Sequence, residues 1–501
     1  MTLYRRLFFT FLFGVSVTGC GGGSSDSTTT PTPPAVTNSA PTLSSANPDQ
    51  TGTVGTAFDY DATQSGTTFN DADNDTLTYS VAYSPAAQGL TDSNGVISGT
   101  PSAEGTITIT LTANDGNGGT ATDEFDITIS PAGVSQAAVQ ARFGGRIDLD
   151  NLENYANQPV PNYITKLNTG GNPITDEGAT LGRVLFYDTA LSFDNTISCA
   201  SCHLQSHGFS DPDVVSTGVE GGVTGRHSMR LINTQFADET NFFWDERADS
   251  HEDQESQPLA DPNEHGFNGE NGRPDLNELF AKLEAIDYYQ ELFNFVYGDT
   301  EVTEERLQMA LAQFVKSIQS FDSKFDEGRA QVNNQRDNFP NFTADENAGK
   351  ALFIDAPNDG GAGCQGCHRA PEFDIRPGSD HNGVVGVAGS NTELDFTNTR
   401  SPSLRDLAAP DGTPNGPFMH DGSLATLMDV VEHYNEIIAP TDAQDRQTFL
   451  NTIDNRLRPN GNLQNLNLTD TQKNQLVAYL RTLTGSSIYT DAKLSDPFTA
   501  N

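Results

Sequence analysis

The chain has 501 residues, of which 27 are lysine or arginine and 68 are aspartate or glutamate, giving a formal net charge of -41 at pH 7. A chain of this length exceeds one compact domain, and length alone predicts about three. The acidic balance excludes nucleic acid as a partner, because phosphates require a basic surface. It is compatible with a basic redox partner, since opposite charges steer encounter, and equally with a solvated acidic surface.

Residues 1–19 are predicted to be a signal peptide rather than part of the fold. The pair Arg5-Arg6 forms a positive segment, and the apolar stretch 7–17 that follows is too short to span a bilayer. No other apolar run approaches about 20 residues, so no further membrane span is expected.

The apolar stretch ends in Val17-Thr18-Gly19-Cys20, which resembles a lipoprotein signal-peptidase box. The resemblance implies that Cys20 becomes a lipidated N-terminus that anchors the chain in the periplasm or cell envelope, in the outer membrane because Gly21 follows. The alternative is an ordinary signal peptide that contains a cysteine. Residues 20–40 are rich in Gly, Ser, Thr and Pro and are expected to form a flexible linker.

Residues 41–131 are expected to form an all-β sandwich. Short alternating runs at 76–81 and 106–112 are separated by Gly, Asn and Asp turns. Three phrases resemble the cadherin-like, dystroglycan-type Ig domains of bacterial surface proteins: Asp71-Ala-Asp-Asn-Asp75, Gly95-Val-Ile-Ser-Gly-Thr-Pro101 and Asp115-Gly-Asn-Gly-Gly-Thr120. Asp71, Asp73, Asp75 and Asp115 offer the hard oxygen ligands that Ca²⁺ prefers. Asx turns between strands explain the same aspartates equally well.

From about residue 136 the pattern becomes helical. Apolar residues recur at three- and four-residue spacing over 276–296 and 304–321, and a further helix is predicted over 470–483 behind the N-cap residue Thr469. Long Gly-, Asp- and Asn-rich loops separate these helices. Such sparse helices indicate that a large cofactor supplies much of the core.

Two pentads carry the most specific chemistry, Cys199-Ala-Ser-Cys202-His203 and Cys364-Gln-Gly-Cys367-His368. Two thiols at this spacing can add across the vinyl groups of one haem, and the following histidine then becomes the iron ligand. A zinc site made from both cysteine pairs is the rival interpretation, but it leaves both histidines without a purpose. The pentads predict two covalent haem c groups, with His203 and His368 on the irons.

The segments around the pentads resemble the bacterial di-haem cytochrome c peroxidases and their relative MauG. These segments are Leu181-Gly-Arg-Val-Leu-Phe186, Leu191-Ser-Phe-Asp-Asn-Thr-Ile-Ser198, Phe243-Trp-Asp-Glu-Arg-Ala248, Pro258-Leu-Ala-Asp-Pro-Asn-Glu264, Gly349-Lys-Ala-Leu-Phe353, Ser401-Pro-Ser-Leu-Arg405 and Phe418-Met-His-Asp-Gly-Ser423. The resemblance implies two mainly α cytochrome c-like domains. Residues 136–345 would hold the peroxidatic haem and residues 346–485 the electron-transfer haem, and residues 486–501 would form a tail.

The resemblance also assigns roles near the first haem. It makes Glu264 the distal acid–base group that moves a proton between the peroxide oxygens. Gln254 and Pro258 would shape the same pocket, and Trp244 would lie between the haems and relay an electron. The simpler alternatives are an acid at a helix terminus or on the surface for Glu264, and a packing aromatic for Trp244.

The chain departs from the peroxidases at two places. Their switchable histidine lies seven residues before an Arg-Asn pair, and Val219 stands there, counted from Arg226. This departure implies an open first iron, as in MauG. His227 replaces the asparagine that binds the family's inter-haem calcium, although Asn415 and Pro417 stand where carbonyl ligands are expected. The calcium is therefore in doubt, and His227 on the first iron is an alternative.

Tyr434 lies fourteen residues after His420, where the peroxidases have a methionine on the second iron and MauG has a tyrosine. The resemblance therefore predicts Tyr434 as the distal ligand, with His433 and Met428 as rivals and plain packing as the alternative. Other histidines show no informative spacing, so surface or hydrogen-bonding roles are expected for His207, His251, His265, His381 and His433.

The sequence as a whole predicts a β-sandwich joined to a two-domain di-haem unit. Its reaction would be the reduction of hydrogen peroxide with electrons from a small cytochrome c or cupredoxin, or MauG-like oxidation of a protein substrate by peroxide. A cell-surface electron-transfer cytochrome without catalysis is the third hypothesis. Retention of Glu264 favours the two enzymes.

Overall fold

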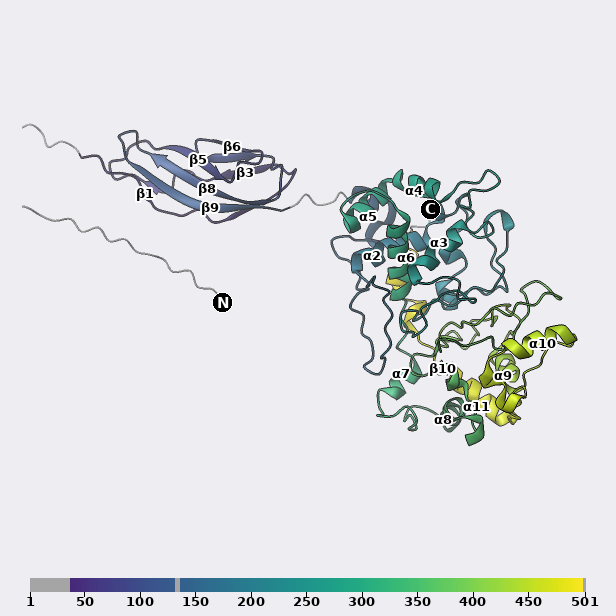
Figure 1. The fold of residues 1–501 in the computed structure, drawn as a ribbon. Coiled ribbons are helices and arrows are strands. Elements are labelled where there is room, and N and C mark those ends of the chain that lie inside the picture. The colour runs from purple at the N-terminus through teal and green to yellow at the C-terminus, as the bar shows by residue number, and fades with distance from the viewer. Residues whose placement is uncertain (1–36, 131–135, 499–501) are drawn as a thin grey trace, which may run out of the picture. The chain divides into compact units, whose positions relative to one another are not determined.

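The computed structural model describes residues 37–130 and 136–498. It divides the chain into two compact units, Met1–Gly133 and Val134–Asn501 (Figure 1). The predicted signal peptide and Cys20 lie outside the described residues. Within the described ranges, no helix has the length and apolar character needed to cross a membrane.

The first unit is built from β-strands. Its larger sheet has the order β2 (Gln50–Thr53), β9 (Thr120–Ser130), β8 (Gly105–Asn114) and β5 (Thr78–Ser84), and a second sheet joins β3 (Phe58–Asp61), β7 (Val96–Gly99) and β6 (Leu90–Ser93). A short pair joins β1 (Thr42–Leu43) to β4 (Phe69–Asn70). All pairs are antiparallel except β2 with β9.

Alternation along β8 and β9 gives this unit its core. Ile107 pairs with Ile127 and Ile109 with Phe125, and all four side chains are buried. Every second residue of a strand faces the same side, so one face of the sheet is apolar and packs inward. The β6–β7 hairpin turns at Asn94-Gly95, where both residues have positive φ, as a two-residue hairpin loop requires.

The second unit is mainly helical, with two short strands. Its helices are α1 (Ala137–Phe143), α2 (Asp176–Tyr187), α3 (His251–Ala260), α4 (Leu276–Glu284), α5 (Asp287–Tyr297), α6 (Glu304–Ser317), α7 (Lys324–Arg329), α8 (Ala344–Ile354), α9 (Leu427–Asn435), α10 (Ala443–Thr452) and α11 (Asp470–Arg481). Strand β10 (His368–Arg369) pairs with β11 (Asp374–Ile375). The helix expected over 276–296 is two helices, because Ile286 is extended and ends the first.

The helices form two cores. Helices α2, α5 and α6 contribute to one core, and α7, α8, α9 and α11 contribute to the other. Each core contains a close helix crossing at a glycine. A Cβ on Gly182 of α2 would lie 2.0 Å from the Ala310 carbonyl of α6, and one on Gly349 of α8 would lie 1.9 Å from the Gln475 carbonyl of α11. Any side chain would force these helices apart.

The cores divide the chain differently from the predicted domain limits. Phe325, Phe339 and Phe342 fall within the predicted peroxidatic domain 136–345, yet they pack in the second core. Ile488 and Leu494, from the predicted tail 486–501, are buried in the first core. Hydrogen bonds hold this last segment in place, with the Arg183 guanidinium donating to the carbonyls of Ala492 and Ser495 at 2.8 Å each.

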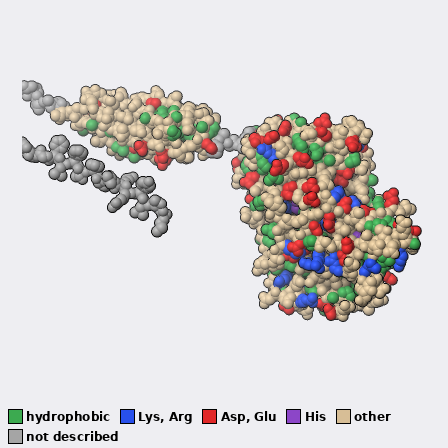
Figure 2. Space-filling model, in the orientation of Figure 1, with side chains coloured by type: hydrophobic (Ala, Val, Ile, Leu, Met, Phe, Trp, Pro, Cys, Tyr) green, Lys and Arg blue, Asp and Glu red, His purple; other side chains and the backbone are tan. Residues whose placement is uncertain are grey.

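Charge is unevenly distributed over the visible surface. Figure 2 shows acidic side chains spread over the second unit, whereas basic side chains gather over the part that contains α7 to α11. An acidic surface interrupted by a basic region favours encounter with partners that carry the complementary pattern.

Candidate haem sites

The first pentad opens into a cavity of about 410 Å³. Cys199, Cys202 and His203 all line it, and a short 3-10 turn, Cys199–Ser201, presents them together. The His203 Nδ1 atom lies 3.1 Å from the Phe209 carbonyl oxygen. With Nδ1–H donating there, the ring is oriented and Nε2 is left for the iron.

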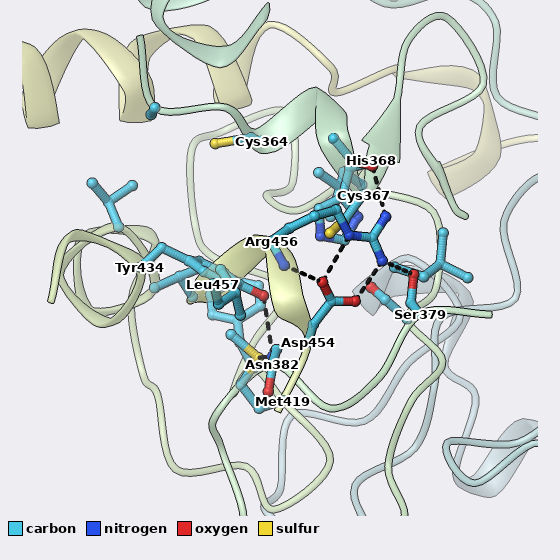
Figure 3. Close-up of a pocket in the computed structure, with 18 of the residues that line it drawn as sticks. Cys364, Cys367, His368, Ser379, Asn382, Met419, Tyr434, Asp454, Arg456 and Leu457 are labelled. Atoms are coloured by element: carbon cyan, nitrogen blue, oxygen red, sulfur yellow. Dashed lines mark hydrogen bonds and ion pairs between the residues drawn. The ribbon is translucent and has the colours of Figure 1, made fainter. Parts of the chain in front are cut away.

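The second pentad opens into a separate cavity of about 560 Å³, lined by Cys364, Cys367 and His368 (Figure 3). Arg456 braces this pentad by donating from Nη1 to the Gly366 carbonyl at 2.8 Å. Burial, reinforced by the Arg456 charge, lowers the pKa of His368 to about 4, so the imidazole is neutral as an iron ligand must be. Both cavity volumes fall within the range of pockets that bind cofactors.

The four cysteines do not form a zinc site. The two pairs line different cavities, and all four thiols are free. Among residues 37–130 and 136–498, one group of three clustered side chains could hold a metal ion, and it contains aspartates only. Two separate thiol pairs, each followed by a histidine in the same cavity, fit two covalently bound haems.

The predicted distal residues line the first cavity with its pentad. Gln254 and Pro258 come from α3, and Glu264 comes from the loop that follows. Val219 does not line the cavity; its backbone N–H donates to the Glu264 carbonyl at 3.1 Å and so supports the loop. Burial, aided by the Asp261 carboxylate, raises the pKa of Glu264 to about 7, although Arg247 opposes the shift. A carboxyl with this pKa exchanges protons readily near neutrality.

Trp244 lies at the junction of the two cavities and lines both. Its indole Nε1–H donates to the His227 carbonyl at 2.7 Å, and its ring centroid is 6.2 Å from that of His420. Its own carbonyl accepts from the N–H groups of Thr399 and Arg400. These contacts fix the indole between the two pentads.

His227 has partners at both ring nitrogens, because Nδ1 lies 3.0 Å from the Asp213 carbonyl and Nε2 lies 3.4 Å from the Ser210 hydroxyl. Neither nitrogen is therefore free for the first iron. The Asn415 carbonyl, where a calcium ligand was expected, instead faces Arg230, whose Nη1 is 3.4 Å away.

Tyr434 lines the second cavity from α9. Its hydroxyl accepts a hydrogen bond of 3.1 Å from the Asn382 side-chain amide, and burial raises its pKa above the usual value. The rivals His433 and Met428 are not among the lining residues, and His433 is engaged with the Asn382 carbonyl at 3.0 Å.

Three residues that line the haem cavities were not predicted from the sequence. The Met419 sulfur lies 3.3 Å from the same Asn382 amide in the second cavity (Figure 3). His251 and Glu255 line the first cavity from one face of α3, and both are buried. His251 is buried, so a surface role is wrong, and neither ring nitrogen has a partner at ordinary hydrogen-bond distance among the described residues. The four-residue spacing on α3 was the available signal.

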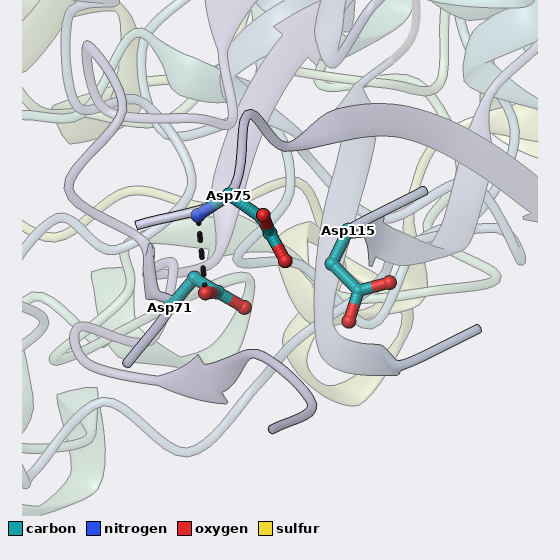
Figure 4. A group of neighbouring side chains, drawn as sticks. All are labelled: Asp71, Asp75 and Asp115. Carbon is teal, nitrogen blue, oxygen red and sulfur yellow. Dashed lines mark hydrogen bonds between the residues drawn. The ribbon is translucent and has the colours of Figure 1, made fainter. Parts of the chain in front are cut away.

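The aspartates of the first unit are only partly brought together. Asp71, Asp75 and Asp115 each place an oxygen within 4.8 Å of the others (Figure 4). Asp73 stands outside this group, and its carboxylate accepts from the Ser39 N–H at 2.7 Å. Asp71 is 7% exposed, and its Oδ2 has no partner among the described residues.

Both units are similar in sequence to known protein families. A family model for di-haem cytochrome c peroxidases matches residues 176–334, and one described as "Putative Ig domain" matches residues 40–130. The methylamine utilization protein MauG of Methylophilus methylotrophus is 28% identical over 64% of this chain and 87% of its own length. The cytochrome c551 peroxidase of Nitrosomonas europaea is 30% identical over 53% and 75% respectively.

A solved structure agrees with these relatives. The crystal structure of a MauG-like protein associated with microbial copper homeostasis matches with a TM-score of 0.54 and 28% identity, covering 68% of this chain and 99% of that one. The β-strand unit, the two haem cavities and these relatives confirm the predicted architecture. The chain belongs to the di-haem cytochrome c peroxidase/MauG family, and it is a peroxide-using oxidoreductase of the peroxidase or MauG type.

Proposed function

We propose that this chain is a MauG-type enzyme, which uses peroxide to oxidise side chains of a partner protein. The observation that supports this choice is Tyr434, which lines the second cavity together with Cys364, Cys367 and His368. A methionine sulfur at this place would favour ferrous iron and a high potential, whereas a phenolate oxygen favours ferric and higher states. The second site would then store oxidising equivalents and accept electrons from ordinary cytochromes poorly.

The haems, when bound, supply peroxide cleavage and one-electron storage. The protein's own groups direct these events. Glu264 takes a proton from the bound peroxide and returns it to the departing oxygen. The Asn382 amide donates to the Tyr434 oxygen and stabilises negative charge on it. Trp244 provides an aromatic group between the two cavities.

Tyr434→Met is expected to raise the midpoint potential of the second haem and to introduce the near-infrared thioether-to-iron band. The substitution exchanges a hard oxygen ligand for a soft sulfur ligand. Redox titration and near-infrared absorption of the purified protein measure both effects. Tyr489→Phe is the matched control, because that hydroxyl lies outside the second cavity and bonds to Asn415. A thioether band already present in the wild type would assign a methionine ligand, with Met419 as the candidate in the cavity, and would refute the MauG-type proposal.

Steady-state turnover separates the two enzyme types. With peroxide and reduced cytochrome c, the wild type should turn over slowly, because the His/Tyr site accepts electrons poorly. Fast turnover would assign the chain to the cytochrome-dependent peroxidases.

We also propose a calcium site in the first unit, formed by Asp71, Asp75 and Asp115. Three carboxylates supply up to six hard oxygens, which suits Ca²⁺. Asp71 belongs to the group, and its Oδ2 atom is buried without a partner among the described residues. Hydrogen bonds, first from the Asn38 amide and then from backbone N–H groups, lower the pKa of Asp115 and keep it charged.

Asp71→Asn is expected to abolish one calcium-binding event in calorimetric titration of the metal-depleted protein. The wild type should gain about 2.7 kcal/mol of unfolding free energy in this unit when calcium is present at a hundred times its dissociation constant. Asp73→Asn is the matched control, since Asp73 lies outside the group. Equal calcium binding by the two variants would leave the aspartates as turn residues only.

A further inference from the structure

The Arg230 guanidinium is a buried cation for which the protein supplies almost no partner. The residue is 8% exposed and lines both haem cavities. Among the described residues its one hydrogen bond is the long contact of 3.4 Å from Nη1 to the Asn415 carbonyl, and Nε has no partner. The guanidinium carbon also lies 5.9 Å from the centroid of the Phe418 ring. No carboxylate of the described chain lies within ion-pairing distance, 4.0 Å, of this side chain.

Two other buried cations in this unit are paired with carboxylates. Arg405 donates to both carboxylate oxygens of Asp326 at 2.8 and 2.9 Å. The Lys316 ammonium lies 3.0 Å from a Glu252 oxygen and also donates to two backbone carbonyls. Arg230 lacks any such arrangement. Because arginine keeps its proton in proteins, an anion from outside the chain that entered either cavity would stabilise this charge.

The acidic groups nearest to Arg230 have other partners, although the Asp406 Oδ2 atom has none among the described residues. Asp406 and Tyr489 both act favourably on its charge. The Asp406 Oδ1 atom, however, accepts from the Gly485 N–H at 2.9 Å and lies 3.3 Å from the Tyr489 hydroxyl. The Tyr489 hydroxyl is in turn 2.7 Å from the Asn415 amide. Neither group forms a hydrogen bond or an ion pair with Arg230 in the described part of the chain, and the guanidinium Nε stays without a partner.

We propose that Arg230 is the counter-ion for haem propionates, shared between the two haem sites. A haem carries two propionates, and the planar guanidinium fork matches a carboxylate with two parallel hydrogen bonds. Arg230 lines both cavities, so one fixed positive charge acts on both irons. A cation beside a haem stabilises the ferrous form, and a charge common to two haems links their potentials. This inference follows from the two cavities and holds for either enzyme type.

The test compares Arg230→Gln and Arg230→Lys with Arg247→Gln in the full, haem-loaded chain. Arg247 lines the first cavity as well, but its side chain is 42% exposed and pairs with Asp245 at 2.8 Å, so the same charge change is screened by solvent. Arg230→Gln should lower the midpoint potential of at least one haem. The ferric-to-ferrous ratio at a fixed potential should change tenfold or more, which is 59 mV for a one-electron couple. Arg230→Lys should recover most of this shift, because it keeps the charge.

Resonance Raman spectra provide a second readout. The propionate bending mode should change in both Arg230 variants, since neither side chain has the guanidinium fork, and should stay unchanged in Arg247→Gln. The proposal would be overturned if Arg230→Gln had the same haem midpoint potentials and the same propionate mode as Arg247→Gln. If Arg230→Gln does not bind haem, the test rests on Arg230→Lys. A propionate bending mode that is unchanged in Arg230→Lys would then overturn the proposal.

Discussion

Replacing Glu264 with glutamine is expected to slow peroxide cleavage by about 10²-fold or more while both haems stay attached. Glutamine keeps the size of the side chain but can neither accept nor return a proton. Glu264 lines the first cavity together with Glu255, whose pKa burial raises to about 8. Stopped-flow mixing of the ferric protein with peroxide measures the step.

The pH dependence of this step follows from the same group. The carboxylate form accepts the peroxide proton, so the wild-type rate should rise as the pH increases through about 7, the value to which burial raises the pKa of Glu264. Asp261→Asn removes the negative charge that helps to raise this pKa, and its inflection should move to lower pH. If Glu264→Gln cleaved peroxide at the wild-type rate with the wild-type pH profile, Glu264 would have a structural role only. Glu255 would then be the candidate for the acid–base group.

Cys199→Ala and Cys364→Ala are each expected to remove about half of the covalent haem, because each cysteine serves one of two separate cavities. Haem stain on denaturing gels and the intact mass of the purified chain measure the loss. Ala200→Ser and Gln365→Ala alter the same pentads without removing sulfur, and both haems should remain. One haem or none in the wild type would contradict the two-site arrangement.

Features specified by short stretches of sequence could be predicted. Helix α11 begins behind Thr469, whose hydroxyl accepts from the Gln472 N–H, as the local pattern indicates. Each pentad brings its own thiols and imidazole together, because five consecutive residues are enough to form the turn. The order of family segments then assigns Glu264 to the first cavity and Tyr434 to the second.

Features that depend on distant contacts could not be predicted. The burial of Ile488 and Leu494 in the first core depends on a surface formed by helices far away in the sequence. Met419 lines the second cavity, and its backbone has a positive φ of 72°. This conformation is uncommon for a residue other than glycine, and no local sequence pattern predicts it here. Histidine is usually polar and partly exposed, but His251 is buried, and its ring packs 4.1 Å from that of Phe242, a contact that the sequence does not indicate.

The packing of the last residues has a consequence for truncated chains. Ile488 and Leu494 lie at the end of the sequence, yet they are buried in the core against which Cys199 packs. A chain cut after residue 485 would lack both side chains. The truncation should therefore destabilise the first haem site, which is far from the cut in sequence, more than the second haem site, which is nearer to it.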